Sequence, residues 1–161
     1  MKNKEKTKGF TLLEMLLSLL VIVIGVLGAF TAVARYSQNT QQEKENLVAS
    51  YLCQEGIEIV KNVRDTNWVN GTTWSTGLAA GNYEADYQSG LVALSGDPRK
   101  LYIDGATNFY KYEAPPTGNT ETPYTRVIAI TANGADELDI VVTVTWSSNT
   151  MVVKQNIFNW Q

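Results

Sequence analysis

One carboxylate, Glu14, lies inside an otherwise apolar segment, and its position is the first indication of chemistry in this chain. Residues 8–25 read KGFTLLEMLLSLLVIVIG, and Glu14 is their only acidic residue. A charged side chain at the centre of a helix in lipid costs about 2.5–3.5 kcal/mol, and less near the interface. A carboxylate in this position therefore requires a partner or a functional reason.

The chain has no histidine and a single cysteine, which restricts the reactions that it could catalyse. Histidine is the commonest general base and metal ligand, so histidine-dependent hydrolases and zinc sites are excluded. Cys53 cannot form an internal disulfide, and its apolar neighbours predict a small core residue rather than a reactive thiol. No carboxylate pair is distinguished by its spacing. We predict no enzyme activity, no metal site and no cofactor.

Charge is distributed unevenly along the 161 residues. The first nine residues carry a net charge of +3, from four lysines and Glu5, although the whole chain carries −3. The acidic remainder argues against binding of nucleic acid, which requires clustered Lys and Arg. With 44% hydrophobic and 18% charged residues, the chain has the composition of a folded protein. Its length allows one domain and a targeting or anchoring segment.

Residues 15–34, MLLSLLVIVIGVLGAFTAVA, contain no charge and as a helix could cross the hydrocarbon layer of about 30 Å. Lysines precede this segment and only Arg35 follows it closely, which predicts a single pass with a cytoplasmic N-terminus and the bulk of the chain outside. Two simpler alternatives remain. An ordinary secretory signal could end at residues 32–34, Ala-Val-Ala, or the segment could be a plain membrane anchor. Neither alternative explains Glu14.

The motif KGFTLLE at residues 8–14, followed by an apolar helix, resembles the class III signal of type IV pilins and of pilin-like proteins, the pseudopilins of type II secretion and DNA-uptake machines. The resemblance implies that prepilin peptidase recognises Lys8 and Gly9 in the leader and cuts between Gly9 and Phe10. It also implies N-methylation of Phe10, and a role for Glu14 in assembly by pairing with the amine of a neighbouring subunit. A glycine at the cut leaves extended backbone unobstructed.

The same resemblance defines the expected segments and partners. Residues 1–9 are the cleaved basic leader, residues 10–36 the hydrophobic transmembrane and assembly half of the helix, and residues 37–161 the extracytoplasmic globular domain. The expected partners are prepilin peptidase, other pilin subunits, membrane lipid, and an inner-membrane assembly platform with its ATPase. The chain itself has no phosphate-binding GxxxxGK[ST] sequence. After assembly the subunit is expected in a fibre at the cell surface.

The predicted fold class is α+β: a long N-terminal helix whose amphipathic second half packs on an antiparallel sheet, which is also the pilin architecture. The absence of proline allows one helix over residues 10–65, with Glu45, Glu55, Glu58 and Lys61 facing water. Apolar spacing predicts a stripe that covers the sheet, formed by Val48, Leu52, Gly56, Ile59 and Val63.

Three segments rich in β-branched and aromatic residues predict the strands of an antiparallel meander: 125–131, 139–146 and 151–160. Polar turns at Asn133-Gly134 and at 147–149 separate them. Alternation in the middle strand directs Ile140, Val142, Val144 and Trp146 toward the helix. The carboxylates Asp136, Glu137 and Asp139 lack the spacing of a calcium loop, so we interpret them as a solvated turn.

Residues 68–124 contain most of the glycines and all four prolines, and short runs at 81–87, 100–104 and 108–113 predict small hairpins with turns at 96–99 and 104–107. Aromatic residues in this region, Trp68, Trp74, Tyr83 and Tyr87, are expected mainly in the core. Recognition of a sugar or a surface by those that are exposed remains an alternative.

Two features distinguish this chain from many major pilins. Thr31 occupies the position where those proteins have a helix-kinking proline, so flexibility would come from Gly25 and Gly28 instead. The pair of cysteines that closes the C-terminal loop of many major pilins is also missing. The pattern therefore favours a minor pilin, with a structural fibre subunit or a pseudopilin as alternatives.

Overall fold

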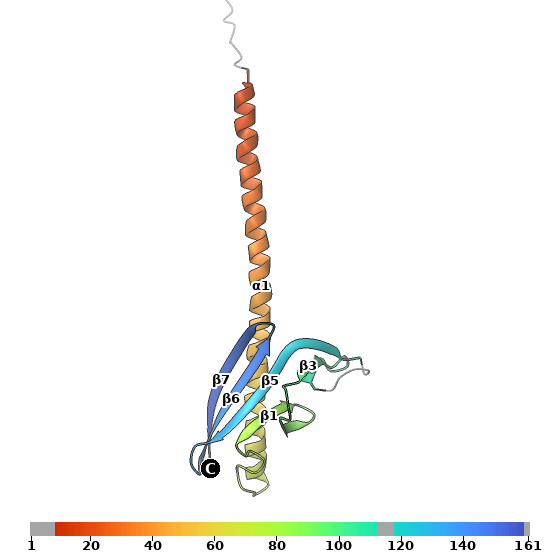
Figure 1. Ribbon diagram of the computed structural model, residues 1–161, viewed down its shortest axis with the longest axis vertical. Coiled ribbons are helices and arrows are strands. Elements are labelled where there is room, and N and C mark those ends of the chain that lie inside the picture. The colour runs from red at the N-terminus through yellow and green to blue at the C-terminus, as the bar shows by residue number, and fades with distance from the viewer. Residues whose placement is uncertain (1–8, 113–117, 160–161) are drawn as a thin grey trace, which may run out of the picture. The chain divides into compact units, whose positions relative to one another are not determined.

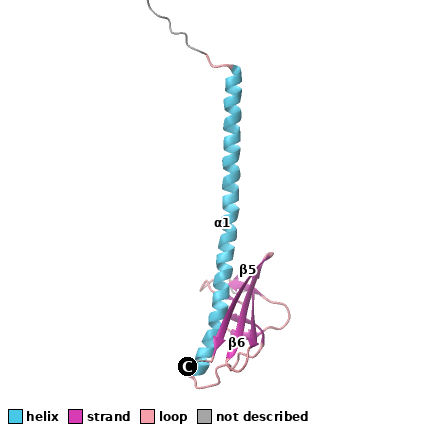
Figure 2. Cartoon of the chain, turned by 90° about the vertical axis from the view of Figure 1, so that its left-hand side faces the viewer, coloured by secondary structure: helices cyan, strands magenta, loops and turns pink. Residues whose placement is uncertain are grey.

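The computed structural model describes residues 9–112 and 118–159, and its elements follow one another as a long helix and then seven strands (Figures 1 and 2). They are α1 (Leu12–Val69), β1 (Gly81–Asp86), β2 (Gly90–Ala93), β3 (Lys100–Ile103), β4 (Tyr110–Lys111), β5 (Thr120–Ala132), β6 (Glu137–Trp146) and β7 (Asn149–Phe158). The chain forms two compact units, Met1–Lys44 and Glu45–Gln161. The predicted α+β class with a pilin-like layout is confirmed.

Helix α1 continues beyond its predicted end at Asp65 and stops at Val69. Gly71 ends it, with φ of 67°, a conformation that glycine adopts without strain. The N–H of Gly71 donates to the carbonyl of Trp68 at 3.0 Å, and the next N–H reaches the carbonyl of Asn67 at 2.9 Å. These bonds form the Schellman pattern that satisfies the last carbonyls of a helix. The Asn-Gly pair at 70–71 was therefore the stop signal in the sequence.

The face of α1 that packs against the sheet is centred on smaller side chains than the sequence predicted. The buried residues of α1 are Ala49, Leu52, Cys53, Gly56, Ile57, Val60 and Arg64. Leu52 and Gly56 were predicted correctly, whereas Val48, Ile59 and Val63 lie at the edge of this face and are partly buried. Small residues occupy the centre because they let the helix backbone approach the strands closely. Cys53 is a core residue, as predicted.

Gly56 marks the closest approach of α1 to the sheet. A Cβ at this position would lie 3.0 Å from Cγ1 of Val142 and 3.4 Å from side-chain carbons of Arg126 and Ile128. Val142 and Ile128 are fully buried, so neither can move into free space. A larger side chain at residue 56 must therefore separate the two layers.

Replacing Gly56 by valine should lower the free energy of unfolding by about 1–3 kcal/mol, the usual cost of overpacking a core. The measurement is urea denaturation of the full chain in detergent micelles, followed by tryptophan fluorescence. Glu58→Val is the matched control, because it places the same side chain on the exposed face of the same helix. Equal effects of the two substitutions would contradict the close packing inferred at Gly56.

Strand β5 is the centre of a seven-stranded sheet in which every pairing is antiparallel. One edge of β5 pairs with β6, and its other edge pairs with β1 near Ile128 and with β3 near Thr125. Strands β5, β6 and β7 form the meander that the sequence predicted. The alternate residues of β6 that were predicted to face the helix are all buried: Ile140, Val142, Val144 and Trp146.

The region between α1 and β5 forms two hairpins, β1–β2 and β3–β4. The predicted runs at 81–87 and 100–104 contain β1 and β3, and β4 lies within the run at 108–113, of which Glu113 falls outside the described residues. Strand β2 was not among the predicted runs. The structure places Trp74 in the core, leaves Trp68 and Tyr83 partly buried and exposes 45% of Tyr87.

Candidate functional site

The first candidate site is the segment that precedes α1. Lys8 lies outside the described residues. Gly9 and Phe10 are exposed and non-helical, and the helix begins two residues later at Leu12. A Cβ added at Gly9 would meet no atom within 4 Å. The bond between Gly9 and Phe10 is therefore accessible, and nothing in the described part of this chain would obstruct a side chain at residue 9.

Thr11 caps the N-terminus of α1, a role that the sequence predictions missed. Its Oγ1 accepts a hydrogen bond from the N–H of Glu14 at 3.3 Å, and its carbonyl accepts one from the N–H of Met15 at 3.2 Å. Threonine is a favoured N-cap because its hydroxyl satisfies a backbone donor that has no partner within the helix. The Thr-x-x-Glu spacing at residues 11–14 is the sequence signal that could have identified it.

Glu14 lies in the first turn of α1, where the helix dipole favours a negative charge. Its backbone is engaged in local hydrogen bonds: its N–H donates to the Thr11 hydroxyl, and its carbonyl accepts a bond from the Ser18 hydroxyl at 2.7 Å. Among the described residues, its carboxylate has no hydrogen bond or ion pair. The carboxylate is thus available to a group from outside this chain or from the segment before residue 9.

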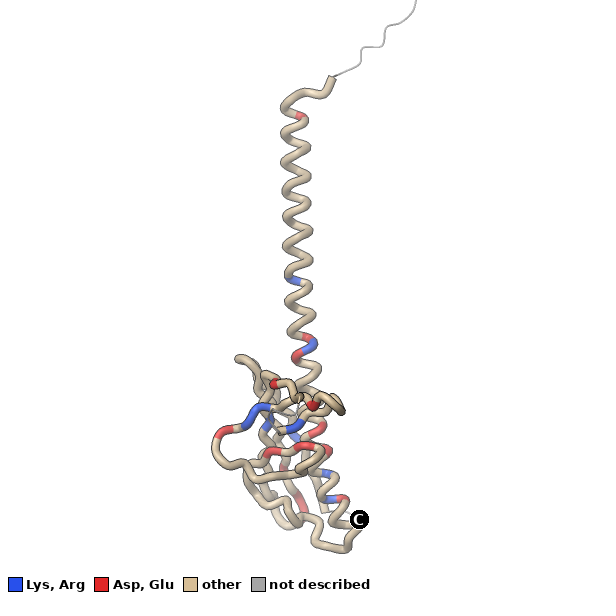
Figure 3. The backbone as a smooth tube through the Cα atoms, turned by 90° about the vertical axis from the view of Figure 1, so that its right-hand side faces the viewer, with Lys and Arg blue, Asp and Glu red and all other residues tan. Residues whose placement is uncertain are grey.

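The N-terminal part of α1 presents an apolar surface. Every large apolar side chain from Phe10 to Val33 is at least 47% exposed, and the helix is long and apolar enough to cross a membrane. Figure 3 shows that charged residues are sparse there and gather on the second unit. The Thr31 hydroxyl bonds to the carbonyls of Leu27 and Gly28, and α1 continues as one helix through Gly25 and Gly28.

Arg126 on β5 joins three elements of the second unit and is fully buried. Its guanidinium donates to the carbonyl of Leu52 at 2.9 Å, to the carboxylate of Glu55 at 2.8 Å and to the carbonyl of Ala85. The prediction that Glu55 faces water is wrong in part, because this ion pair holds its side chain at 32% exposure. The network connects α1, β1 and β5 across the core.

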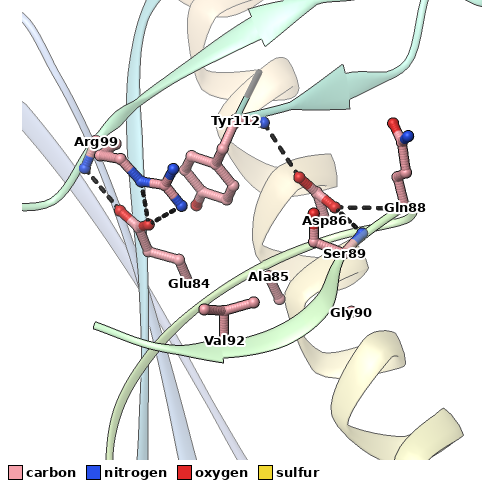
Figure 4. A pocket seen from close by; sticks show the side chains of 9 residues that line it. All are labelled: Glu84, Ala85, Asp86, Gln88, Ser89, Gly90, Val92, Arg99 and Tyr112. Atoms are coloured by element: carbon pink, nitrogen blue, oxygen red, sulfur yellow. Dashed lines mark hydrogen bonds and ion pairs between the residues drawn. The ribbon is translucent and has the colours of Figure 1, made fainter. Parts of the chain in front are cut away.

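A cavity of about 250 Å³ lies beside β1 and the turn that follows it, and two buried carboxylates line it (Figure 4). The Glu84 carboxylate binds three nitrogens of Arg99. The backbone N–H and Nε of Arg99 each donate at 2.7 Å, and a terminal guanidinium nitrogen lies at 2.6 Å. The Arg99 guanidinium also lies over the Tyr112 ring, 4.9 Å from its centre. Glu84 thus has its charge neutralised by this chain.

The second carboxylate of the cavity, Asp86, organises the turn after β1. It accepts backbone N–H groups from Gln88 at 3.0 Å, from Ser89, and from Tyr112 at 3.1 Å. An aspartate that bonds to the N–H two residues later is a common turn-forming device. Both cavity carboxylates thus bind donors from this chain and fix the shape of the hairpin. Sequence reasoning identified neither residue.

Asp104 connects the β3–β4 turn to two other side chains. It accepts bonds from the N–H of Ala106 at 2.8 Å, from Nζ of Lys111 at 2.9 Å and from the Tyr87 hydroxyl at 3.3 Å. The Ala106 N–H first, and then Lys111, hold the pKa of Asp104 well below its ordinary value of 3.8. As the pH falls, Asp104 is therefore protonated at a higher pH in the unfolded chain than in the folded chain.

The free energy of unfolding should consequently fall as the pH is lowered below about 4, because the stabilisation by Asp104 is present above its unfolded pKa and is lost as the pH falls toward its folded pKa. Asp104→Asn should weaken that dependence, since an amide does not titrate. The measurement is chemical denaturation between pH 2 and pH 6. Asp97→Asn, at an exposed position, is the control, and it should retain the wild-type dependence.

Two of the three carboxylates near the β5–β6 turn, Asp136 and Glu137, accept bonds from asparagines, whereas Oδ1 of Asp139 is buried without a hydrogen-bond partner among the described residues. Glu137 is bonded to Asn133 at 3.0 Å and to Asn156 at 2.6 Å, and Asp136 is bonded to Asn159 at 2.9 Å. Within the described residues, no group of three or more Asp, Glu or Cys side chains is arranged to hold a metal ion. Asp136 lies in an exposed turn, as predicted, whereas Glu137 and Asp139 belong to strand β6 and are partly buried, so the prediction of a solvated turn is wrong for those two.

Comparison with known proteins gives one match, at the N-terminus. Residues 5–30 match the family model of the prokaryotic N-terminal methylation motif. No curated protein and no solved structure matches the chain. The matched motif is a type IV pilin-like signal. The matched range includes Gly9, Phe10, Thr11 and Glu14.

Proposed function

We propose that this chain is a type IV pilin-like subunit, most similar to a minor pilin, that is assembled into a pilus or pseudopilus fibre through α1. Prepilin peptidase would cut between Gly9 and Phe10 and methylate the new amine of Phe10. The main support is the methylation motif at residues 5–30, which lies at the start of an exposed apolar helix that continues into an α+β unit.

The exposed apolar surface of α1 supports both stages of this function. Before assembly, residues 10–36 would lie in the cell membrane, with the leader in the cytoplasm and residues 37–161 outside. During assembly, contacts with lipid would be replaced by contacts with the helices of other subunits, where packing rather than hydrophobicity drives association. An assembly platform and its ATPase would supply the work, because extraction of so much apolar surface from lipid is unfavourable.

Glu14 would fix the position of an incoming subunit. Its carboxylate has no partner among the described residues, and cleavage would create a cationic amine at Phe10 of each subunit. In lipid or in the apolar interior of a fibre, a carboxylate is stable only when it is paired. Pairing with the Phe10 amine of a neighbour would satisfy both groups and set the axial register.

Replacing Glu14 by glutamine should lower incorporation into fibres about tenfold or more, because the neighbour's buried amine would lose its counter-charge, which costs more than the roughly 1.4 kcal/mol that corresponds to a factor of ten. The measurement compares the amount of subunit in sheared surface fibres with the amount in the membrane. Glu43→Gln, another exposed glutamate of α1, is the control. Wild-type incorporation of the Glu14 variant would contradict the assembly role.

Two features favour a minor pilin over a major one: Thr31 stands where a proline is common, and the chain has only one cysteine. A pseudopilin of a type II secretion or DNA-uptake system is the alternative within the same family. A membrane-anchored or secreted surface-binding protein with an ordinary signal is the alternative of another class.

The mass of the mature N-terminal peptide tests the proposal against these other classes. An N-methylated Phe10 is the expected result, measured on protein recovered from membranes and from sheared fibres. A first residue of Arg35 would identify an ordinary secreted protein, and an intact Met1 or Lys2 would identify a plain anchor. Either of those results would overturn the proposed function.

A further inference from the structure

We infer that Thr11 is a positioning residue for the cleavage, because it fixes where α1 begins and so keeps the Gly9–Phe10 bond outside the helix. The inference rests on the proposed function. It concerns the second residue after the proposed cut, whose hydroxyl and carbonyl accept hydrogen bonds from the first turn of α1.

The hydrogen bonds at the start of α1 define its first residue. The first helical bond runs from the N–H of Met15 to the carbonyl of Thr11, and the Thr11 hydroxyl occupies the N–H of Glu14. This arrangement uses the backbone of Glu14 and leaves its carboxylate unengaged. The start of the helix is therefore fixed by backbone N–H groups and Thr11, without the Glu14 carboxylate.

The scissile carbonyl belongs to Gly9 and precedes the first helical bond by two residues. If α1 began one turn earlier, the pattern of bonds four residues apart would direct the N–H of Leu13 to the Gly9 carbonyl. That carbonyl would then be engaged within the helix, and its peptide bond would no longer be extended. Gly9 and Phe10 are instead exposed and non-helical.

The cleavage itself is hydrolysis, in which the peptide bond between Gly9 and Phe10 breaks. Water supplies a hydroxyl to the Gly9 carbonyl carbon and a proton to the Phe10 nitrogen. Attack requires an open path to that carbon and a polarised, unengaged carbonyl oxygen. Both conditions are met only in the population of chains whose helix begins after Phe10. Thr11 raises that population, since an N-cap favours the helix start at which it lies.

The test uses the full-length precursor in phosphatidylethanolamine and phosphatidylglycerol vesicles with prepilin peptidase, with cleavage followed by mass spectrometry. Thr11→Val keeps the shape of threonine and removes the hydroxyl, and it should lower kcat/KM about fivefold. The effect should appear mainly in KM, because a smaller competent population weakens apparent binding while the chemistry stays unchanged. Thr31→Val removes a hydroxyl elsewhere in α1 and should have no effect.

Two further variants distinguish positioning from direct contact with the peptidase. Thr11→Ser and Thr11→Asn both restore an N-cap, although their shapes differ, so both should recover most of the wild-type kcat/KM. Recovery with serine but not with asparagine would overturn the inference, because it would show that the peptidase recognises the hydroxyl group directly. Equal kcat/KM for wild type and Thr11→Val would overturn it as well. Failure of the wild-type chain to be cut at Gly9 would instead refute the proposed function.

Discussion

Replacing Gly9 by valine should abolish removal of the leader and leave the rest of the molecule folded. In the proposed cleavage the peptidase would bind extended backbone at the cut, and a branched side chain at the scissile residue would displace the carbonyl from the attacking group. A displacement of about 1 Å can reduce a rate about 100-fold. Among the described residues, a Cβ at Gly9 meets no atom within 4 Å, so the substitution should not disturb the fold. The loss of cleavage can therefore be assigned to the peptidase reaction.

The readout is the mass of the N-terminal peptide from the membrane fraction, which should retain the leader in Gly9→Val. Gly25→Val is the control: residue 25 also lies in open space, within α1 but well beyond the cut. It should be cleaved like the wild type. Efficient production of N-methylated Phe10 from Gly9→Val would show that the leader is recognised elsewhere.

Replacing Arg126 by alanine should destabilise the second unit by about 2–6 kcal/mol, because two buried carbonyl groups lose their donor at about 1–3 kcal/mol each. The substitution leaves the carbonyls of Leu52 and Ala85 without their donor in a dry interior and opens a cavity between the layers. The cost of leaving the Glu55 carboxylate without its partner is smaller, because its side chain is 32% exposed and can be hydrated.

Urea denaturation of the full chain in detergent micelles, followed by tryptophan fluorescence, gives the free energy of unfolding. Lys100→Met is the matched control, because the Lys100–Glu121 pair joins neighbouring strands on the surface, with both side chains more than half exposed. It should change the stability little, since exposed ion pairs contribute little. A similarly small effect of Arg126→Ala would contradict a structural role for the buried network.

The candidate processing segment was predictable because its information is local. Charge, apolar length and the Lys-Gly-Phe motif can all be read from adjacent residues, and residues 5–30 match the methylation motif. The N-cap role of Thr11 could also have been predicted, from its Thr-x-x-Glu spacing to Glu14. Whether Glu14 meets the amine of a neighbour depends on a second subunit and is not encoded in any pattern within one chain.

The sequence by itself determined the long helix, the three strands of the meander and the inward residues of β6, because these follow from periodicity and turn chemistry within a few residues. Only the tertiary structure decided the centre of the buried helix face, the partners of Arg126 and Glu55, and the pairing of β5 with both β1 and β3. Arg126 is 71 residues from Glu55 in the sequence and 41 from Ala85, so its burial depends on packing between elements rather than on its neighbours. Contacts across such separations leave no periodic signal, and for that reason the buried Arg126 could not be distinguished from a surface residue, whereas Gly56 was already placed on the sheet-facing side of α1 by the local spacing of apolar residues.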